Sequence, residues 1–291
     1  MSSVTRLGGL LPRSWIKVVS RAQWKHPLLK RVFDFCADKF RNQDGTIQQG
    51  AGKGLRFNVG QSNAGFLLGT AEPSVQVALQ SLIKPGMTFY DVGANVGFLS
   101  VIAARLVGAN GRVVCFEPLP ENIHQIEHNI RLNSFKQVDV RHEALGDENG
   151  EALFLVSAET TWGKLAKVGP SVAMQVGEIK VPVRRLDSMI ENNELPQPDV
   201  IKIDVEGAEV SVLEGARESL NKARPILLVE LHGTNRGVSD ELNELNYTTA
   251  VLGSTLSIVD APWDAYVLAI PSERSDLLPV LEKFKGLAEL R

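Results

Sequence analysis

Four carboxylates stand at or near the ends of short apolar segments of this 291-residue chain. They are Asp91, Glu117, Asp204 and Glu230. In an open α/β sheet the carboxyl ends of the parallel strands meet at one edge, and ligands bind there. Carboxylates gathered at such an edge can accept hydrogen bonds from hydroxyl or amino groups, take up a proton, or ligate a metal.

The first carboxylate opens a turn, Asp91–Gly97, that joins an apolar strand to an apolar helix. The dinucleotide fingerprint places glycine at the first, third and sixth positions, but here Asn95 and Phe98 occupy the last two. NAD and FAD are therefore disfavoured, and the Gly-Lys-Ser/Thr of a P-loop is absent from the sequence. The turn resembles the first motif of S-adenosylmethionine (SAM) methyltransferases. That resemblance implies that Asp91, Gly93, Asn95 and Gly97 surround the methionine part of SAM.

Glu117 ends a second apolar segment, 26 residues beyond Asp91. An acidic residue at the end of the second strand holds the ribose hydroxyls in nucleotide-binding folds of this type. The sequence therefore predicts that Glu117 binds a ribose, although this feature alone does not separate SAM from NAD.

Apolar strands and amphipathic helices alternate along most of the chain, which is typical of a parallel sheet. We predict an α/β fold with a doubly wound, mostly parallel, seven-stranded Rossmann-like sheet. Its expected strands lie near 87–92, 112–117, 137–142, 200–204, 225–231, 247–252 and 265–270. Its expected helices lie near 73–83, 97–107, 119–133, 207–221, 238–246 and 275–288. An extra pair of strands is expected within 152–156 and 179–183.

Charge is unevenly distributed along the sequence. Residues 1–60 hold 11 Lys and Arg against 3 Asp, whereas the remaining 231 residues hold 20 against 31 Asp and Glu. We predict a basic, helical N-terminal extension or cap over residues 1–60 and a methyltransferase domain over residues 61–291. A basic helix interleaved with Trp and Leu can also lie on an anionic membrane, which stays open as an alternative.

Several classes of protein are disfavoured by composition. No apolar run reaches the ~18 residues of a membrane span, and no signal peptide is recognised at the N-terminus. Cys36 and Cys115 give no disulfide framework, so a cytoplasmic location is expected. The main domain is acidic and carries no nucleic-acid-binding motif, so nucleic acid is not expected as a partner.

Seven ordered stretches between residues 69 and 235 resemble the FkbM family of SAM-dependent methyltransferases. The longest is Ile201-Lys202-Ile203-Asp204-Val205-Glu206-Gly207-Ala208-Glu209. The others are Gly69-Thr70-Ala71-Glu72-Pro73, Asp91-Val92-Gly93-Ala94-Asn95-Val96-Gly97, Phe116-Glu117-Pro118, Ala144-Leu145-Gly146-Asp147, Leu186-Asp187 and Val229-Glu230-Leu231-His232. The resemblance implies methyl transfer from SAM to an oxygen of a sugar, a glycan or a natural-product-type small molecule.

Four further positions take roles from this resemblance. Glu143 and Ala144 are expected to flank the adenine, and Asp204 to lie closest to the transferred methyl group. Glu72 is expected to close over the cofactor from the N-terminal side.

An alcohol acceptor must lose its proton, and a base with a pKa near neutral suits that step. His232 follows the fifth predicted strand, and strand alternation places it on the same side as Glu230. We predict that His232 or Asp204 assists deprotonation, with Glu230 beside them and without a metal. As an alternative, Asp204, Glu230 and His232 together could hold Mg²⁺ or Mn²⁺. Glu206 and Glu209 are read as helix-dipole partners in a first turn.

The polar loop near 158–176 is the expected acceptor side, with Thr160, Thr161, Trp162 and Lys164 as candidates. Two other functions stay open. A nicotinamide-dependent oxidoreductase would bind NADH, and a non-catalytic module would bind SAM without turnover.

Overall fold

The computed structural model describes residues 41–63, 65–157, 163–165 and 175–286. A seven-stranded sheet runs through the centre, in the order β12-β13-β11-β10-β3-β4-β5. The strands are β3 (Thr88–Val92), β4 (Arg112–Phe116), β5 (Val138–Arg141), β10 (Val200–Ile203), β11 (Ile226–Glu230), β12 (Tyr247–Val251) and β13 (Tyr266–Pro271). The first five pair in parallel, and β13 pairs antiparallel with both β11 and β12. The predicted fold class is confirmed.

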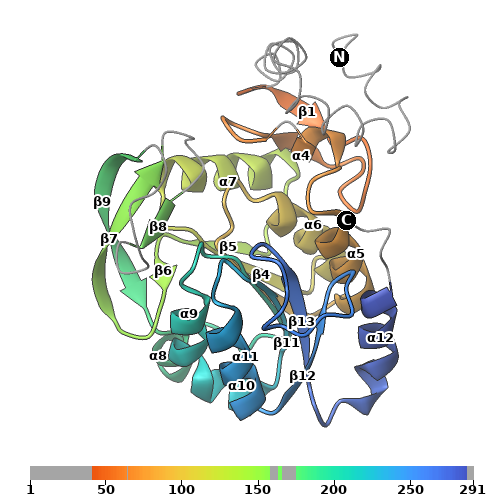
Figure 1. Cartoon of the computed structure of the whole chain (residues 1–291). Coiled ribbons are helices and arrows are strands. Elements are labelled where there is room, and N and C mark those ends of the chain that lie inside the picture. The colour runs from red at the N-terminus through yellow and green to blue at the C-terminus, as the bar shows by residue number, and fades with distance from the viewer. Residues whose placement is uncertain (1–40, 64, 158–162, 166–174, 287–291) are drawn as a thin grey trace, which may run out of the picture.

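Helices cover both faces of the sheet, as Figure 1 shows. The strands are largely apolar because alternate side chains enter separate cores on the two faces. Phe89 of β3 packs into the core with α5 (Pro73–Leu82) and α6 (Phe98–Val107), whereas the next residue, Tyr90, packs into the opposite core. That second core includes α8 (Leu186–Glu191), α9 (Glu209–Gly215), α10 (Arg217–Ala223) and α11 (Asn235–Glu244). The sheet is therefore doubly wound.

A hairpin at the N-terminal end of the described chain joins the first core. It comprises β1 (Asp44–Thr46) and β2 (Arg56–Asn58), which pair antiparallel. Phe57 packs edge-to-face on Phe98 at the start of α6, with the ring centroids 5.7 Å apart. The backbone N–H of Asn58 donates to Oδ1 of Asn129 in α7 (Pro120–Leu132). A short helix follows the hairpin, α4 (Gly65–Leu68).

The basic segment 1–40 lies outside the described residues, and so does the helical structure predicted within it. The division of the chain after residue 60 stays a prediction. Among the described residues, no helix combines the length and the apolar character that a membrane crossing requires.

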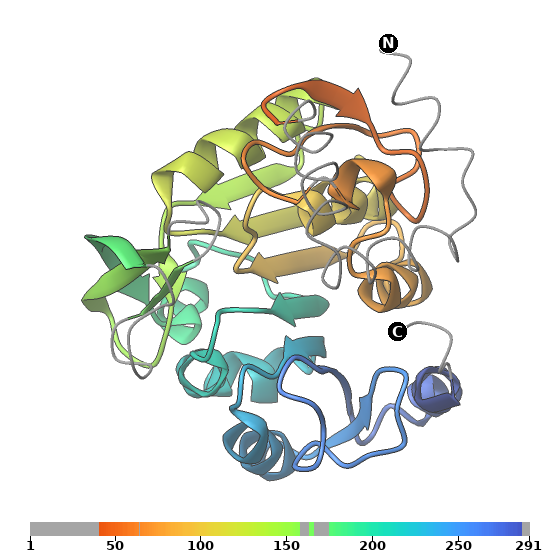
Figure 2. The same cartoon turned by 45° about the horizontal axis from the view of Figure 1, so that its top comes forward.

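A second, four-stranded sheet lies at one side of the molecule and appears in green in Figure 2, far from α12 in dark blue. It contains β6 (Ala144–Leu145), β7 (Gly150–Ser157), β8 (Gly163–Leu165) and β9 (Gln175–Arg184), in the order β6-β9-β7-β8. The predicted extra pair corresponds to β7 and β9, which run antiparallel.

Three predicted helices differ from the structure. The helix expected near 207–221 is two short helices, α9 and α10, which meet at Ala216. Gly215 contacts the backbone of Gly146 there: a Cβ at Gly215 would lie 1.8 Å from the Gly146 carbonyl oxygen. Near the C-terminus a 3-10 turn, Ser275–Leu277, precedes α12 (Leu278–Gly286). The helix expected near 238–246 begins earlier, at Asn235.

Candidate active site

The turn after β3 is the centre of the candidate site, and its backbone needs glycine. Gly93 and Gly97 have φ angles of 77° and 82°, in the left-handed region. A Cβ on Gly93 would lie 1.8 Å from the carbonyl oxygen of Asp204, so no other residue fits there without moving that strand end. The turn after β3 and the end of β10 are therefore in direct backbone contact.

Glu117 is fixed by the same turn. Its Oε2 accepts a hydrogen bond of 2.8 Å from the backbone N–H of Asn95, and its Oε1 accepts one of 3.0 Å from that of Leu119. Asn95 itself has a φ of 51°, and this left-handed backbone aims its N–H at the carboxylate. Burial raises the pKa of Glu117 to about 7, although these hydrogen bonds act to lower it.

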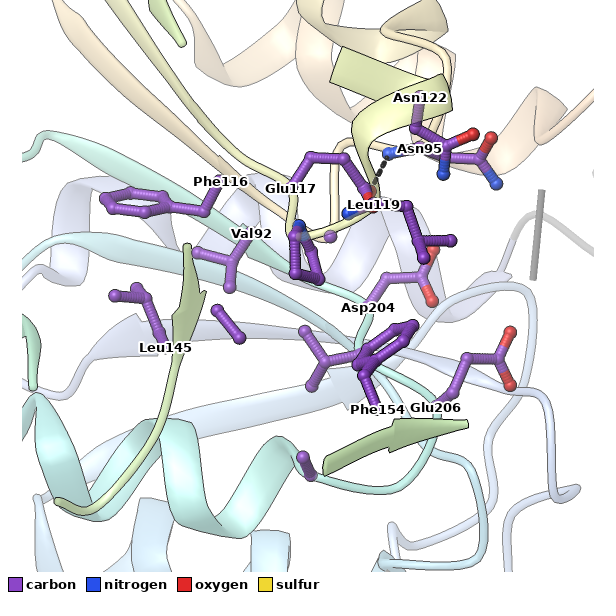
Figure 3. Close-up of a pocket in the computed structure, with 15 residues that line it drawn as sticks. Val92, Asn95, Phe116, Glu117, Leu119, Asn122, Leu145, Phe154, Asp204 and Glu206 are labelled. Atoms are coloured by element: carbon purple, nitrogen blue, oxygen red, sulfur yellow. Dashed lines mark hydrogen bonds between the residues drawn. The ribbon is translucent and has the colours of Figure 1, made fainter. Parts of the chain in front are cut away.

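A cavity opens between this turn, β7 and the end of β10. Its polar lining includes Glu117, Asn122 and Asp204, and its apolar lining includes Leu145 and Phe154. Figure 3 shows Leu145 and Phe154 on the side away from Glu117 and Asn122. An apolar wall opposite a carboxylate suits a ligand with a flat, apolar part and hydroxyl groups.

The two residues predicted to flank an adenine are separated. Ala144 lines this cavity, but Glu143 is not among its lining residues. The Glu143 carboxylate instead pairs with Arg141 at 3.1 Å and with Arg184 at 3.9 Å. Of these two residues, only Ala144 is therefore placed for direct contact with a ligand in this cavity.

A second cavity lies next to the first and shares part of its lining. Gly93, Asn95 and Asp204 line both, while Glu72 and Asp91 line only the second. Most of the predicted cofactor residues therefore line one or both cavities, whereas Gly97 and Glu143 line neither.

Asp91 lies beneath the second cavity in a buried network. Its Oδ2 accepts a 2.6 Å hydrogen bond from the hydroxyl of Ser100, and its Oδ1 lies 3.2 Å from Nζ of Lys202. Nζ of Lys202 also lies 3.3 Å from Oδ2 of Asp204 and donates to the Gly93 carbonyl oxygen at 2.8 Å. Burial lowers the pKa of Lys202, but Asp204 and Asp91 outweigh burial and raise that pKa well above its ordinary value. Asp91 therefore supports the turn through an internal ion pair.

Glu72 reaches the site from the residue before α5. Its backbone is left-handed, with a φ of 45°, and its Oε2 accepts a 3.1 Å hydrogen bond from the hydroxyl of Tyr266. The same hydroxyl lies 3.3 Å from Oδ2 of Asp204. Burial raises the pKa of Glu72 to about 7, against the lowering effect of Lys202. The structure thus places Glu72 over the second cavity, next to Asp204.

His232 lies where β11 ends, and the structure brings it to Asp204 and Glu230 as the sequence predicts. Its side chain is 5% exposed, and Nδ1 lies 2.9 Å from Oε1 of Glu209. Nε2 lies 3.8 Å from both Asp204 Oδ1 and Glu230 Oε1, and 3.6 Å from Glu206 Oε2.

These carboxylates control the protonation of His232. Burial lowers the pKa of His232, but the hydrogen bond to Glu209 and the charges of Glu206 and Asp204 raise it to about 9. Burial and the Asp204 charge raise the pKa of Glu230 to about 9 as well. This arrangement favours the protonated form of His232.

The sequence predicts Glu206 and Glu209 as partners of a helix dipole, but their side chains also contact His232. Glu209 does stand in the first turn of α9, but its side chain is fully buried against His232. Glu206 precedes the helix, in a left-handed conformation with a φ of 53°, and lines the first cavity.

Sequence reasoning missed three side chains of the site. Lys202 is a charged residue inside an otherwise apolar strand, which was a usable signal. Nothing local marks Tyr266, or Trp263, whose ring centroid lies 5.0 Å from that of His232 and which is 56% exposed. The predicted acceptor residues Thr160, Thr161 and Trp162 lie outside the described part of the chain.

Comparison with known proteins identifies the family. A family model described as the methyltransferase FkbM domain matches residues 91–249, which is more than half of the chain. The chain belongs to the FkbM methyltransferase family. The match includes the turn after β3, Glu117 and the carboxylates around His232, and it confirms the resemblance seen in the sequence.

The individual methyltransferases that resemble this chain have low sequence identity to it. This chain is 26% identical over 164 residues to the hexuronic acid methyltransferase AglP of Haloferax volcanii. The match covers 56% of this chain and 64% of AglP. The chain is also 26% identical over 189 residues to the 2-O-methyltransferase NoeI of Sinorhizobium fredii, covering 59% and 76%. A crystal structure of an FkbM methyltransferase from Methylobacillus flagellatus gives a TM-score of 0.44 at 20% identity, covering 63% of this chain and 43% of that one. The chain therefore spans less than two thirds of AglP.

Proposed function

We propose that this protein transfers the methyl group of SAM to a hydroxyl oxygen of a sugar, a glycan or a related small molecule. The observation that carries the proposal is the pair of neighbouring cavities that share Gly93, Asn95 and Asp204 in their lining. A nucleoside bonded to an amino acid is an extended ligand with two unlike ends. Its reactive centre, between those ends, would lie beside Asp204.

The residues of each cavity fit one end of SAM. In the first, Glu117 can accept hydrogen bonds from the ribose hydroxyls, and Leu145 and Phe154 can pack on the adenine. In the second, Glu72 is placed to meet the positively charged amino group.

Charge supports the same ligand. Carboxylates line both cavities, whereas Lys202 is the only Lys, Arg or His among the residues described as lining them. SAM carries a positive sulfonium, which an excess of negative charge would attract. A dinucleotide, with two phosphates, would be repelled.

When bound, SAM supplies a methyl group that is already electrophilic, so the protein must align it with the acceptor oxygen. The new C–O bond forms as the C–S bond breaks, and the hydroxyl proton leaves in the same step. The carboxylates around His232 raise its pKa and so favour its protonated form, which leaves these carboxylates as the acceptors we propose for that proton. We assign the proton to a carboxylate facing Nε2 of His232, Asp204 or Glu206, with Glu230 beside them.

The acceptor class rests on the relatives. One is named as acting on a hexuronic acid and another as a 2-O-methyltransferase. A sugar hydroxyl is therefore our proposal for the acceptor. A cytoplasmic location and contact of the basic segment 1–60 with a membrane surface stay predictions.

Calorimetric titration with SAM, S-adenosylhomocysteine and NADH tests the cofactor. We expect the two sulfur compounds to bind and NADH not to bind. Glu117→Ala should weaken both, while Glu121→Ala, an exposed glutamate in the first turn of α7, should not. Binding of NADH alone would support the oxidoreductase reading instead.

Transfer of a labelled methyl group from SAM to a panel of glycosides then tests turnover. Label in the sugar is the expected result. Tight SAM binding with no label in any glycoside, lipid-linked sugar or small-molecule alcohol would favour the non-catalytic module.

A further inference from the structure

His232 is held by a buried carboxylate that fixes which ring nitrogen carries hydrogen. Glu209 is fully buried, and its Oε2 accepts a 2.9 Å hydrogen bond from the hydroxyl of Thr234. Its Oε1 accepts a 2.9 Å bond from the backbone N–H of Gly207 and lies 2.9 Å from Nδ1 of His232. A carboxylate that already accepts two hydrogen bonds is an acceptor for Nδ1–H as well. The ring is thereby oriented with Nε2 toward Asp204, Glu206 and Glu230.

Nε2 of His232 has no hydrogen-bond partner among the described residues, although the side chain is 95% buried. Three carboxylate oxygens face it at 3.6 to 3.8 Å, from Asp204, Glu206 and Glu230. These distances exceed those of an N–H···O hydrogen bond. This ring nitrogen therefore lies within ion-pair distance of three carboxylates without a hydrogen bond to any of them.

We propose that Asp204, Glu230 and His232 bind one divalent cation between them. One ligand atom from each residue lies within 4.8 Å of the other two. Adjacent ligands of an ion bound at about 2.1 Å lie about 3 Å apart and opposite ligands about 4.2 Å apart. The 3.8 Å separations of Nε2 from the Asp204 and Glu230 oxygens fall between these limits.

The donor set favours Mn²⁺ or Mg²⁺. Carboxylate oxygens suit both ions, and a single imidazole shifts the preference from Mg²⁺ toward Mn²⁺. A ligating imidazole commonly donates its other N–H to a carboxylate, which is the position of Glu209. The ion takes the place of the proton on Nε2, and that proton goes to solvent.

The role of the ion rests on the proposed function. The site includes Asp204, which lines both cavities, so a hydroxyl bound to the ion would stand next to the methyl group. A bound divalent ion makes a hydroxyl more acidic. Because Asp204 is then a ligand, the proton passes to Glu206, the remaining carboxylate that faces the ring.

Titration of the chelator-treated, full-length protein with Mn²⁺, followed by the spin-resonance signal of free Mn²⁺, tests the site without SAM. We expect one ion per chain and at least tenfold weaker binding in His232→Gln and in Glu230→Gln. The matched controls are His142→Gln and Glu282→Gln, which change side chains that are 58% and 66% exposed and should bind as the unchanged protein does.

Glu209→Gln separates positioning from ligation. It keeps a hydrogen-bond acceptor but loses the charge, and we expect binding weakened by about 10- to 100-fold. Each variant is also titrated with S-adenosylhomocysteine, which should bind as before and so reports intact folding. Absence of a bound ion at millimolar Mn²⁺, or equal binding by His232→Gln, would overturn the proposal. The titration with S-adenosylhomocysteine tests the proposed cofactor separately, so failure of the metal site does not decide whether the cofactor binds.

Discussion

Replacing Glu117 by Gln should make the folded protein less sensitive to alkaline pH. Glu117 is 4% exposed, and burial raises its pKa from the ordinary 4.5 to about 7. Between these values the unfolded chain has lost the proton while the folded chain keeps it. The folded state therefore binds more protons, and its stability falls as pH rises through this window.

The magnitude follows from the two pKa values. A difference of one pKa unit corresponds to about 1.4 kcal/mol, so the full loss is about 3 kcal/mol once the pH exceeds the folded pKa. Below pH 4.5 both states hold the proton and the loss vanishes. A glutamine cannot ionise, so Glu117→Gln removes this pH-dependent loss of stability. Any cost from its altered hydrogen bonds remains, but that cost does not change with pH.

The assay is thermal unfolding of both proteins, without ligand, at pH 5 and pH 8. The melting temperature of Glu117→Gln minus that of the unchanged protein should rise by roughly 5 to 10 °C between the two pH values. The constant cost cancels in this comparison, and so do the other titrating groups. Parallel melting curves across this range would show that Glu117 is ionised normally, and the argument from burial would fail.

Three further outcomes are expected. Gly93→Ala should abolish S-adenosylhomocysteine binding in a calorimetric titration, because its Cβ would collide with the Asp204 carbonyl. Gly86→Ala is the control, since Gly86 also has a positive φ but lies in open space, and it should bind S-adenosylhomocysteine as the unchanged protein does. Lys202→Met should cost about 3 to 5 kcal/mol in chemical denaturation, because it leaves buried carboxylates uncompensated; a loss below 1 kcal/mol would contradict this. Trp263→Ala should raise the acceptor KM but not that for SAM, since the exposed ring lies beside His232; an unchanged acceptor KM would exclude that contact.

The order of strands and helices was predictable because it depends on short-range patterns. Apolar runs of five residues bounded by Gly, Pro or polar residues mark the strands, and an apolar period of 3.6 residues marks helices such as α7. The helix expected near 207–221 was wrong in its continuity. Next to the break, Gly215 packs on the backbone of Gly146, a contact between residues 69 positions apart that no local pattern encodes.

The carboxylates of the candidate site were predictable for a different reason. Parallel strands end at one edge of a sheet, so residues at strand ends gather there whatever the register. The pairs that depend on register were not predictable. Lys202 lies opposite Asp91 in the pairing of β10 with β3, and Tyr266 lies opposite Glu230 in the pairing of β13 with β11. Which strands are neighbours, and in which register they pair, decides both pairs. Both are properties of the whole fold.

The candidate site also lowers the stability of the chain that carries it. Asn95, Glu72 and Glu206 all have left-handed backbones, and each such residue costs of the order of 1 kcal/mol or more. Burial adds a further cost by raising the pKa values of Glu72 and Glu117. Neutral or glycine replacements at these positions should therefore stabilise the fold while weakening cofactor binding. A gain in stability with a loss of cofactor binding is expected where a sequence keeps strained and charged residues for a ligand. Lys202 differs from these residues, because its loss should reduce both stability and binding.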